Sequence, residues 1–237
     1  MKLLVLAGGF GTRLQSVVSD VPKALAPING IPFLEFQIEN WLNQGVDSFI
    51  FLLHYQASMV IEFLKKERQR LFKECEVNWI VEPAPLGTGG AIAFAVDKLA
   101  ICGEFLATNA DTWLGTGLQD IWLNDAPSLA VVKVNDVGRY GALKCTENGF
   151  ITSFQEKSKS SGAGLINAGV SHLNPELFND WNGKPFSIEN IFYRDWVERK
   201  ILKAVLLETT FIDIGIPSDY FNFCRWINAK KVGPLWI

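Results

Sequence analysis

The sequence predicts an α/β fold built on a doubly wound, mostly parallel sheet with helices on both of its faces. Short, continuously apolar runs typical of buried strands alternate with longer segments whose apolar residues recur at helical spacing. The first apolar run ends in a tight glycine loop, and short turns rather than helices join several runs of the second half. These observations indicate a Rossmann-like, mixed sheet with a small antiparallel extension.

Strands and helices alternate through the first half of the chain. Strands are expected at residues 3–7, 49–53, 77–81 and 105–108. Helices are expected at residues 32–43, 58–72 and 88–99. The segment 58–72 is amphipathic, because Ile61 and Leu64 recur among charged residues such as Lys65 and Lys66. Alternation of this kind is typical of a doubly wound sheet.

The second half shows a different pattern. Strands are expected at residues 129–134, 142–146 and 150–154, joined by short turns such as Glu-Asn-Gly at 147–149. An apolar run at 166–170 contains an asparagine and small residues, and further helices are expected at 187–200 and 218–228. Because no repeat, low-complexity tract or linker interrupts the sequence, we expect residues 1–237 to form a single domain.

The composition disfavours several classes of protein. Of the 237 residues, 49% are apolar and 20% are charged, so the chain can bury a sizeable core. The net charge of −3 supplies no basic field for nucleic acid. No apolar run approaches the roughly 20 residues that span a bilayer. We therefore expect neither nucleic acid nor a membrane as a partner.

The cysteines favour a reducing compartment. None of the four forms a CxxC pair or lies at zinc-finger spacing with a histidine. The apolar N-terminal run is too short for a signal peptide. We expect a cytoplasmic protein with reduced, mostly buried thiols at Cys75, Cys102, Cys145 and Cys224. Trp196 and Trp226 are expected in the core, and a homodimer stays open because tryptophans also suit subunit contacts.

Residues 6–14, with the sequence Leu-Ala-Gly-Gly-Phe-Gly-Thr-Arg-Leu, form the most informative segment. Glycines after a buried strand let the backbone approach a ligand and turn its N–H groups toward phosphate oxygens. A structural turn is the alternative. The loop lacks the GxGxxG spacing of dinucleotide-binding proteins, which disfavours an NAD-linked oxidoreductase. The candidate phosphate-binding residues are Leu6, Ala7, Gly8, Gly9, Gly11, Thr12 and Arg13.

Two further loops carry candidate ligand-binding residues. Lys23 can return to the same phosphates as a second cation, or it is an exposed loop lysine. The loop at 82–91 feeds glycines into a helix N-terminus, where free N–H groups can contact a base, unless it is a plain connection. Its candidate residues are Glu82, Gly87, Thr88 and Gly89.

Two aspartates are candidate metal ligands. Asp111 lies just past a buried strand, in the crevice where open α/β sheets bind ligands. The nearby Asn109 is a candidate nucleotide-binding residue. Asp213 lies in an apolar run, where an ionised side chain needs a partner. We interpret Asp213 as a second metal ligand, with a turn or helix-capping residue as the alternative.

The glycine loop at 8–14 followed by Pro-Lys at 22–23 resembles the signature of the sugar-1-phosphate nucleotidyltransferases. The segments at 82–91, 109–112 and 211–217 are similar to the family in order and spacing, although Ala110 replaces the usual glycine of Asn-Gly-Asp. The resemblance extends from residue 3 to about residue 225. It implies a Rossmann-like α/β fold in which a sugar 1-phosphate attacks the α-phosphate of a nucleoside triphosphate and releases pyrophosphate.

The resemblance also implies roles for individual residues. Arg13 would clamp the pyrophosphate, Lys23 would bridge toward the sugar phosphate, and Mg²⁺ would bind Asp111 and Asp213. The half at about 1–112 would bind the nucleotide, Glu82 meeting the base, and the half at about 113–237 would bind the sugar phosphate. Residues on the sugar side would be Tyr140, Gly141, Glu156, Lys157, Asn167 and Ala168. Lys157 would also be catalytic.

The segments at 19–28, 85–91 and 164–169 are most similar to D-glycero-D-manno-heptose 1-phosphate guanylyltransferases, which implies GTP and that heptose phosphate as substrates. Another nucleotide or another sugar phosphate, such as glucose, mannose or N-acetylmuramate 1-phosphate, stays open. A catalytically silent sugar-nucleotide sensor is the alternative from a different class, and it is disfavoured because both candidate metal ligands and all three candidate cations are present.

Overall fold

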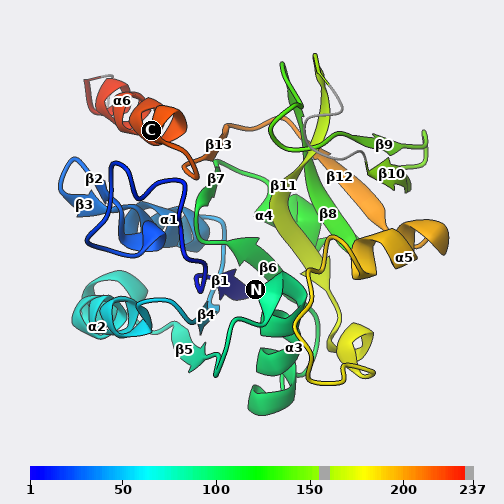
Figure 1. The fold of residues 1–237 in the computed structure, drawn as a ribbon, viewed down its shortest axis with the longest axis horizontal. Coiled ribbons are helices and arrows are strands. Elements are labelled where there is room, and N and C mark those ends of the chain that lie inside the picture. The colour runs from blue at the N-terminus through cyan, green and yellow to red at the C-terminus, as the bar shows by residue number, and fades with distance from the viewer. Residues whose placement is uncertain (155–160, 233–237) are drawn as a thin grey trace.

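The computed structural model describes residues 1–154 and 161–232. At its centre is a sheet of nine strands, one side of which is parallel (Figure 1). β1 pairs with strands on both of its sides, so the chain winds outward from β1 in two directions, as in a doubly wound sheet. The parallel strands, in spatial order, are β6 (Phe105–Asn109), β1 (Lys2–Leu6), β4 (Ser48–Leu53) and β5 (Glu76–Val81).

Helices cover both faces of the parallel strands, as the sequence predicts. α1 (Phe33–Asn43) and α2 (Ala57–Glu67) contribute to the core that contains Leu3 and Val5. α3 (Gly87–Leu99) contributes to a second core that contains Leu4. Because successive side chains of a strand point to opposite faces, these two cores lie on opposite sides of the sheet.

The antiparallel extension is also present, with a different pairing from the expected one. β11 (Gly164–Leu173) pairs antiparallel with β6 and joins the second half of the chain to the parallel strands. β9 (Leu143–Cys145) and β10 (Ile151–Phe154) form the expected hairpin. β8 (Ser128–Val134), however, pairs with β11 and with the unexpected parallel strand β12 (Lys203–Leu207) rather than with β9.

Three expected helices differ in length. The first, at 58–72, is α-helical only to Glu67, and Arg68–Phe72 forms a π-helical turn. The second, at 187–200, is α-helical only in α5 (Phe192–Glu198), because the residues before it pack as a loop against α3. The last, at 218–228, extends over α6 (Pro217–Val232).

The third core holds the C-terminal helix against the first half of the chain. Phe223 of α6 packs against Phe33 of α1 and against Trp113, which belongs to the short strand β7 (Thr112–Leu114). Trp196 is buried as expected, whereas Trp226 is only partly buried. Other short elements are β2 (Pro27–Ile28), β3 (Ile31–Pro32), β13 (Phe211–Asp213), α4 (Leu118–Trp122) and the 3-10 turns Lys23–Leu25 and Pro175–Phe178.

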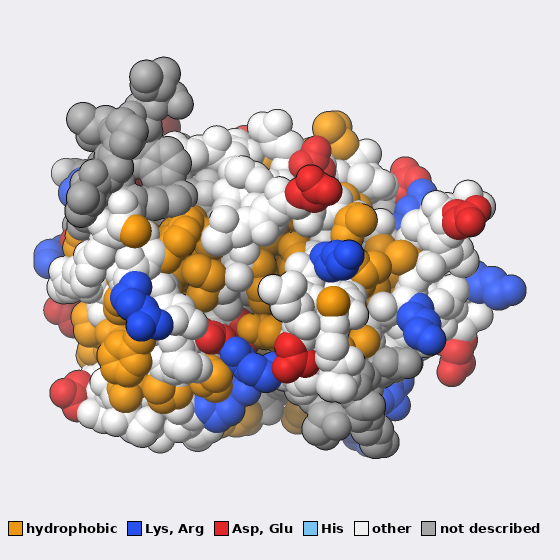
Figure 2. Space-filling model, turned by 90° about the horizontal axis from the view of Figure 1, so that it is seen from above, with side chains coloured by type: hydrophobic (Ala, Val, Ile, Leu, Met, Phe, Trp, Pro, Cys, Tyr) orange, Lys and Arg blue, Asp and Glu red, His pale blue; other side chains and the backbone are white. Residues whose placement is uncertain are grey.

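The expectation of mostly buried cysteines is wrong. Cys102 and Cys145 are exposed, Cys75 and Cys224 are half-buried, and all four are free. Cys75 and Cys102 lie in loops and Cys145 ends β9, where apolar periodicity says little about burial, whereas Cys224 lies in the middle of α6. None of the helices in residues 1–154 and 161–232 is long and apolar enough to cross a membrane. On the face drawn in Figure 2, Lys and Arg side chains are spread among acidic and hydrophobic ones.

Candidate active site

A cleft of about 460 Å³ opens at the carboxyl ends of the parallel strands. Residues that follow β1, β4, β5 and β6 all line it, which is the edge where open α/β sheets bind ligands. All the residues predicted to bind the nucleotide except Gly89 lie in its wall, as does Asp111. These residues are Leu6, Ala7, Gly8, Gly9, Gly11, Thr12, Arg13, Lys23, Glu82, Gly87, Thr88 and Asn109.

The glycine loop is held against β4 by its backbone and leaves its polar side chains free. The Ala7 N–H donates to the Leu52 carbonyl at 2.9 Å, and the Gly8 carbonyl accepts from the Tyr55 N–H at 3.3 Å. Gly11 has a φ of 63°, a conformation that glycine adopts without strain. Thr12 and Arg13 are exposed and line the cleft, where they are available to phosphate oxygens.

Lys23 and two aspartates form a polar centre at one end of the cleft. The Lys23 ammonium donates to the carboxylate of Asp111, and its Nζ lies 3.9 Å from Oδ1 of Asp213. The exposed fractions of the three side chains are 12%, 33% and 21% in that order, so neither carboxylate is turned toward bulk solvent. The two aspartates expected to share a cation therefore do share one, although that cation is an ammonium.

Strand pairing explains why residues so far apart in the sequence meet here. β13 pairs antiparallel with β7, and the register sets Asp213 opposite Thr112. Beyond the pair, the Ile214 N–H donates to the Asp111 carbonyl at 3.0 Å. One short ladder of hydrogen bonds thus brings the two carboxylates to the same edge of the cleft.

The charges at this centre are unbalanced. Burial raises the pKa of Asp213, and the negative charge of Asp111 raises it further, while Lys23 and the Gly215 N–H oppose the rise. That N–H donates to Oδ1 of Asp213 at 2.7 Å. Two carboxylates facing one ammonium leave a net negative charge, which a divalent cation would neutralise better than Lys23 does.

The donor set fits a hard divalent cation that also binds phosphate. Carboxylate oxygens are the ligands that Mg²⁺ prefers, and protein sites often supply only one or two of them. In the part of the chain that the structure describes, no group of three or more His, Cys, Asp or Glu side chains is arranged around a common metal position. Asp111 and Asp213 could therefore hold such a cation together with oxygens of a bound phosphate.

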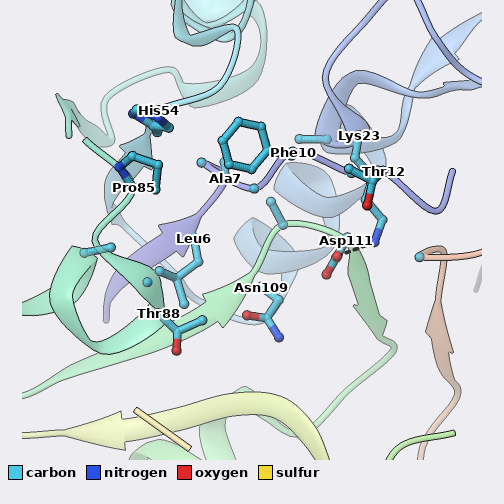
Figure 3. Close-up of a pocket in the computed structure, with 18 of the residues that line it drawn as sticks. Leu6, Ala7, Phe10, Thr12, Lys23, His54, Pro85, Thr88, Asn109 and Asp111 are labelled. Atoms are coloured by element: carbon cyan, nitrogen blue, oxygen red, sulfur yellow. Dashed lines mark hydrogen bonds and ion pairs between the residues drawn. The ribbon is translucent and has the colours of Figure 1, made fainter. Parts of the chain in front are cut away.

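A buried carboxylate occupies the opposite end of the cleft. Glu82 follows β5, is only 7% exposed, and its Oε2 accepts from the Leu86 N–H at 2.9 Å. Burial raises the pKa of this carboxyl group, and the Leu86 hydrogen bond opposes the rise. Figure 3 shows His54 and Pro85 at this end, whereas Thr12, Lys23 and Asp111 gather at the other, with Phe10 between them.

The N-terminus of α3 is only partly available to a ligand, which corrects one expectation. The sequence predicts free N–H groups in the loop at 82–91, where glycines enter the helix. The Gly89 N–H instead donates to the Phe186 carbonyl at 3.1 Å, and the Gly90 N–H donates to the same oxygen at 3.2 Å. The Phe186 ring lies so close to Gly89 that a β-carbon there would clash with it.

The loop that contains Phe186 also brings a carboxylate into the cleft from the second half of the chain. Oε2 of Glu189 accepts from the Thr88 hydroxyl at 2.7 Å, and the Thr88 oxygen accepts from the Ile188 N–H at 3.0 Å. Glu189 lines the cleft wall. The sequence predicts a helix at 187–200 instead of this loop, because the spacing of its apolar residues is compatible with a helix as well as with a loop.

The described residues of the expected sugar side do not line this cleft. The Tyr140 ring packs against the Phe211 ring, with 5.4 Å between the ring centroids, and Phe211 belongs to the strand that carries Asp213. Gly141 is the next residue after Tyr140, and neither lines the cleft. Asn167 accepts from the Gly169 N–H at 2.9 Å. The Ala168 side chain is wholly buried, so only its backbone could meet a ligand. Glu156 and Lys157 lie outside the described residues.

The cleft residues that were not predicted include Phe10, His54, Glu189 and Gly215. A signal existed for His54, because it follows a buried strand in the same way as Asp111 does. Phe10 lies inside the glycine loop and could have been included with it. Gly215 lies inside the segment 211–217 and could have been included with Asp213. Nothing local distinguishes Glu189 from an ordinary loop residue, since only the packing of distant segments places it in the cleft.

Known proteins are similar to this chain over nearly its whole length. The nucleotidyl transferase family matches residues 2–229. D-glycero-alpha-D-manno-heptose 1-phosphate guanylyltransferase from Campylobacter jejuni is 36% identical over 225 residues, which is 94% of this chain and 98% of that protein. Mannose-1-phosphate guanylyltransferase 1 from Arabidopsis thaliana is 34% identical, with 95% of this chain covering 64% of the plant protein.

Solved structures show a similar relationship. The crystal structure of HddC from Yersinia pseudotuberculosis has a TM-score of 0.84 and 35% sequence identity to this chain. The match covers 95% of this chain and 99% of that one. A second structure of the same protein, complexed with GMP-PN, has a TM-score of 0.83.

Proposed function

The chain belongs to the nucleotidyl transferase family, and on that premise we propose that it joins GTP to D-glycero-α-D-manno-heptose 1-phosphate, forming GDP-heptose and pyrophosphate. The observation that carries the proposal is the meeting of Lys23, Asp111 and Asp213 beside a glycine loop at one end of a single cleft. That end offers cations, backbone N–H groups and carboxylates together, which is the set that a nucleoside triphosphate and its counter-ion require.

The reaction demands alignment rather than a strong base. A phosphate oxygen of the sugar phosphate attacks the α-phosphorus, the new P–O bond forms, and the bond to the bridging oxygen breaks as pyrophosphate leaves. Because the nucleophile is already an anion, no side chain has to remove a proton from it. The protein's contribution is to hold two mutually repelling phosphates in line and to offset their charge. Arg13 and Lys23 are the described cations suited to this task, and Lys157 is proposed as a third.

Mg²⁺ is part of the proposal, with Asp111 and Asp213 as the residues that would hold it. The fit is supported by their shared cation, because two carboxylates already face one positive charge at this position. When bound, the ion would neutralise charge on the phosphate oxygens. Lys23 would then be free to turn toward those phosphates.

The choice of substrates rests on relatives and on the form of the cleft. The Campylobacter jejuni relative is named for the heptose phosphate and a guanylyl group, and the Yersinia pseudotuberculosis protein was crystallised with GMP-PN. We propose that Glu82 faces the base and that Tyr140, Gly141, Glu156, Lys157, Asn167 and Ala168 bind the sugar phosphate. Mannose 1-phosphate is a second candidate, because a mannose-1-phosphate guanylyltransferase is 34% identical.

We also propose that residues 1–237 act as a single domain. Hydrogen bonds between β6 and β11 support this, because they join strands from both halves of the chain into one sheet. The nucleotide-binding half, at about 1–112, would then be rigidly joined to the sugar-phosphate-binding half.

A panel of substrates tests the proposal. Pyrophosphate release is measured with GTP, ATP, UTP or dTTP, each combined with the heptose, mannose or glucose 1-phosphate, with Mg²⁺ and with EDTA. We expect the fastest release with GTP, heptose 1-phosphate and Mg²⁺, and none with EDTA. Faster release with mannose 1-phosphate would favour the second candidate. Tight nucleotide binding without release from any pair would contradict the proposed reaction and favour a sensor.

A further inference from the structure

We propose that His54 is a specificity-determining residue, whose distal ring nitrogen accepts a hydrogen bond from the exocyclic 2-amino group of guanine. The inference deepens the proposed function, because it concerns the base end of the same cleft. It rests on the position of His54, on the proton that its ring must carry, and on a second acceptor beside it.

The position of His54 is set by the sheet. β4 runs parallel to β1, and His54 is the first residue after β4, just as Ala7 is the first residue after β1. Both residues line the cleft. In Figure 3 His54 lies at the end away from Lys23, Thr12 and Asp111. If the triphosphate is bound at the end that carries Lys23 and the glycine loop, its nucleoside would extend toward His54.

One hydrogen bond determines where the imidazole proton lies. Nδ1 of His54 is 3.2 Å from the carbonyl oxygen of Glu82. A carbonyl can only accept, so Nδ1 carries the proton and donates it. In the neutral ring, Nε2 is then an acceptor. Among residues 1–154 and 161–232 no hydrogen bond uses Nε2, which leaves that atom to a ligand.

Two contacts with the glycine loop also restrain His54. A β-carbon built on Gly8 would lie 3.1 Å from both the β-carbon and the backbone nitrogen of His54, so the two chain segments are in close contact. The Phe10 ring approaches the His54 ring edge-on, with 6.0 Å between the ring centroids. The first contact restrains the backbone and the β-carbon of His54, and the second covers one side of its ring.

A second acceptor lies next to the same glycine. Oε1 of Glu82 would be 2.9 Å from a β-carbon on Gly8, and Oε2 is already engaged by the Leu86 N–H. Glu82 Oε1 and the β-carbon of His54 therefore both lie beside Gly8, so the loops after two neighbouring strands each bring an acceptor-bearing side chain to this end of the cleft. Guanine presents two adjacent donors, the N1–H and the 2-amino group, whereas adenine presents an acceptor at N1. The arrangement suits guanine.

The experiment measures nucleotide affinity rather than turnover. Dissociation constants of GTP and of ITP, which lacks only the 2-amino group, are determined by calorimetric titration for the wild type and two variants. In His54→Asn the amide nitrogen can replace Nδ1 and still donate to the Glu82 carbonyl, but the distal acceptor is gone. In His54→Gln the amide reaches the position of Nε2, and its oxygen can accept.

The expected results separate the two ring nitrogens. The wild type should bind GTP about tenfold more tightly than ITP, the effect of one hydrogen bond in a partly buried site. His54→Asn should lower that ratio to about one by weakening GTP binding and leaving ITP binding unchanged, and His54→Gln should retain most of the ratio. Tyr55→Phe, the matched control, should leave it unchanged, because Tyr55 packs against Phe10 and does not line the main cleft.

Three results would overturn the proposal: a wild type that does not distinguish GTP from ITP, a His54→Asn variant that keeps the wild-type ratio, or equal losses in His54→Asn and His54→Gln. Thermal melting of each variant establishes that it is folded. The proposed reaction is judged separately by pyrophosphate release. A protein that shows the expected GTP-to-ITP ratios and releases no pyrophosphate would refute the reaction and support the role of His54.

Discussion

Lys23 and Asp111, separated by 88 residues, form an ion pair at the phosphate end of the cleft. Oδ1 of Asp213 lies 3.9 Å from the same ammonium nitrogen. The lysine thus stands where the proposed function requires a divalent cation. If the proposed function is correct, a metal ion would compete with Lys23 for the two carboxylates, and a bound phosphate would favour the metal by attracting the lysine.

Replacing Lys23 should change metal binding and turnover in opposite directions. In Lys23→Met the two carboxylates lose their ammonium, so the nucleotide-free protein should bind Mn²⁺ more tightly, by about tenfold. Pyrophosphate release should fall by about 10²–10³, as for the loss of one transition-state contact. Free Mn²⁺ is counted by electron paramagnetic resonance, with Lys66→Met as the exposed control. Weaker Mn²⁺ binding by Lys23→Met would show that the lysine does not occupy the metal position.

Removing either carboxylate should remove the cation site while the fold remains. Asp111→Asn and Asp213→Asn are each expected to lower pyrophosphate release by at least about 10²-fold. Burial raises the pKa of Asp213, so a neutral amide that still accepts from the Gly215 N–H should not lower the melting temperature. Asp136→Asn, at an exposed turn, is the control. Turnover near the wild-type rate in Asp111→Asn would refute its role as a metal ligand.

A single added methyl group at residue 215 should disturb the same centre. A β-carbon there would lie 2.7 Å from Oδ1 of Asp213 and 2.8 Å from Nζ of Lys23. Gly215→Ala is therefore expected to weaken Mn²⁺ binding by about tenfold through displacement of the carboxylate. Gly9→Ala is the matched substitution, since no atom lies within 4 Å of its added β-carbon, and it should leave Mn²⁺ binding unchanged. Equal Mn²⁺ affinities for the two variants would contradict this expectation.

The buried carboxyl group of Glu82 should make stability depend on pH with a definite sign. Its pKa is raised in the folded protein, so ionisation is less favourable there than in the unfolded chain, where the value is about 4.3. This contribution to stability is present below that value and is lost as the pH rises through the raised pKa. Glu82→Gln has no such loss and can keep the hydrogen bond from Leu86.

The melting temperature of Glu82→Gln relative to the wild type should therefore rise as the pH increases above about 4.3, and it should level off once the pH exceeds the raised pKa of the folded protein. Scanning calorimetry of both proteins in buffers of equal ionic strength measures the difference. Asp136→Asn again serves as the exposed control. A difference that is constant with pH, or that falls as the pH rises, would show that Glu82 is not destabilised by burial.

Much of the fold could be predicted because burial patterns are local. A strand such as β1, buried on both faces, needs a continuous apolar run, and a helix such as α1 needs apolar residues at helical spacing. The nucleotide-binding candidates followed from the same logic, because residues after parallel strands converge on one edge of the sheet. That rule applies equally to His54 and was not extended to it.

Pairing and loop packing could not be predicted in the same way. β8 and β12 pair although they are far apart in the sequence, and the residues of neither strand indicate which strand it pairs with. The segment that carries Phe186 and Glu189 has apolar residues at a spacing compatible with a helix. The Phe186 carbonyl instead accepts hydrogen bonds from N–H groups in the first turn of α3. Such choices depend on which distant hydrogen-bonding groups would otherwise stay unpaired.

By itself the sequence determined the alternating strands and helices, the glycine loop, and the two aspartates that needed partners, because each is a property of neighbouring residues. Only the tertiary structure decided that Asp111 and Asp213 share the ammonium of Lys23, and that His54 and Glu82 both lie beside Gly8. The physical reason is that these distances are set by the register between β7 and β13 and by the order of β1, β4 and β5. Hydrogen bonds between residues far apart in the chain fix both.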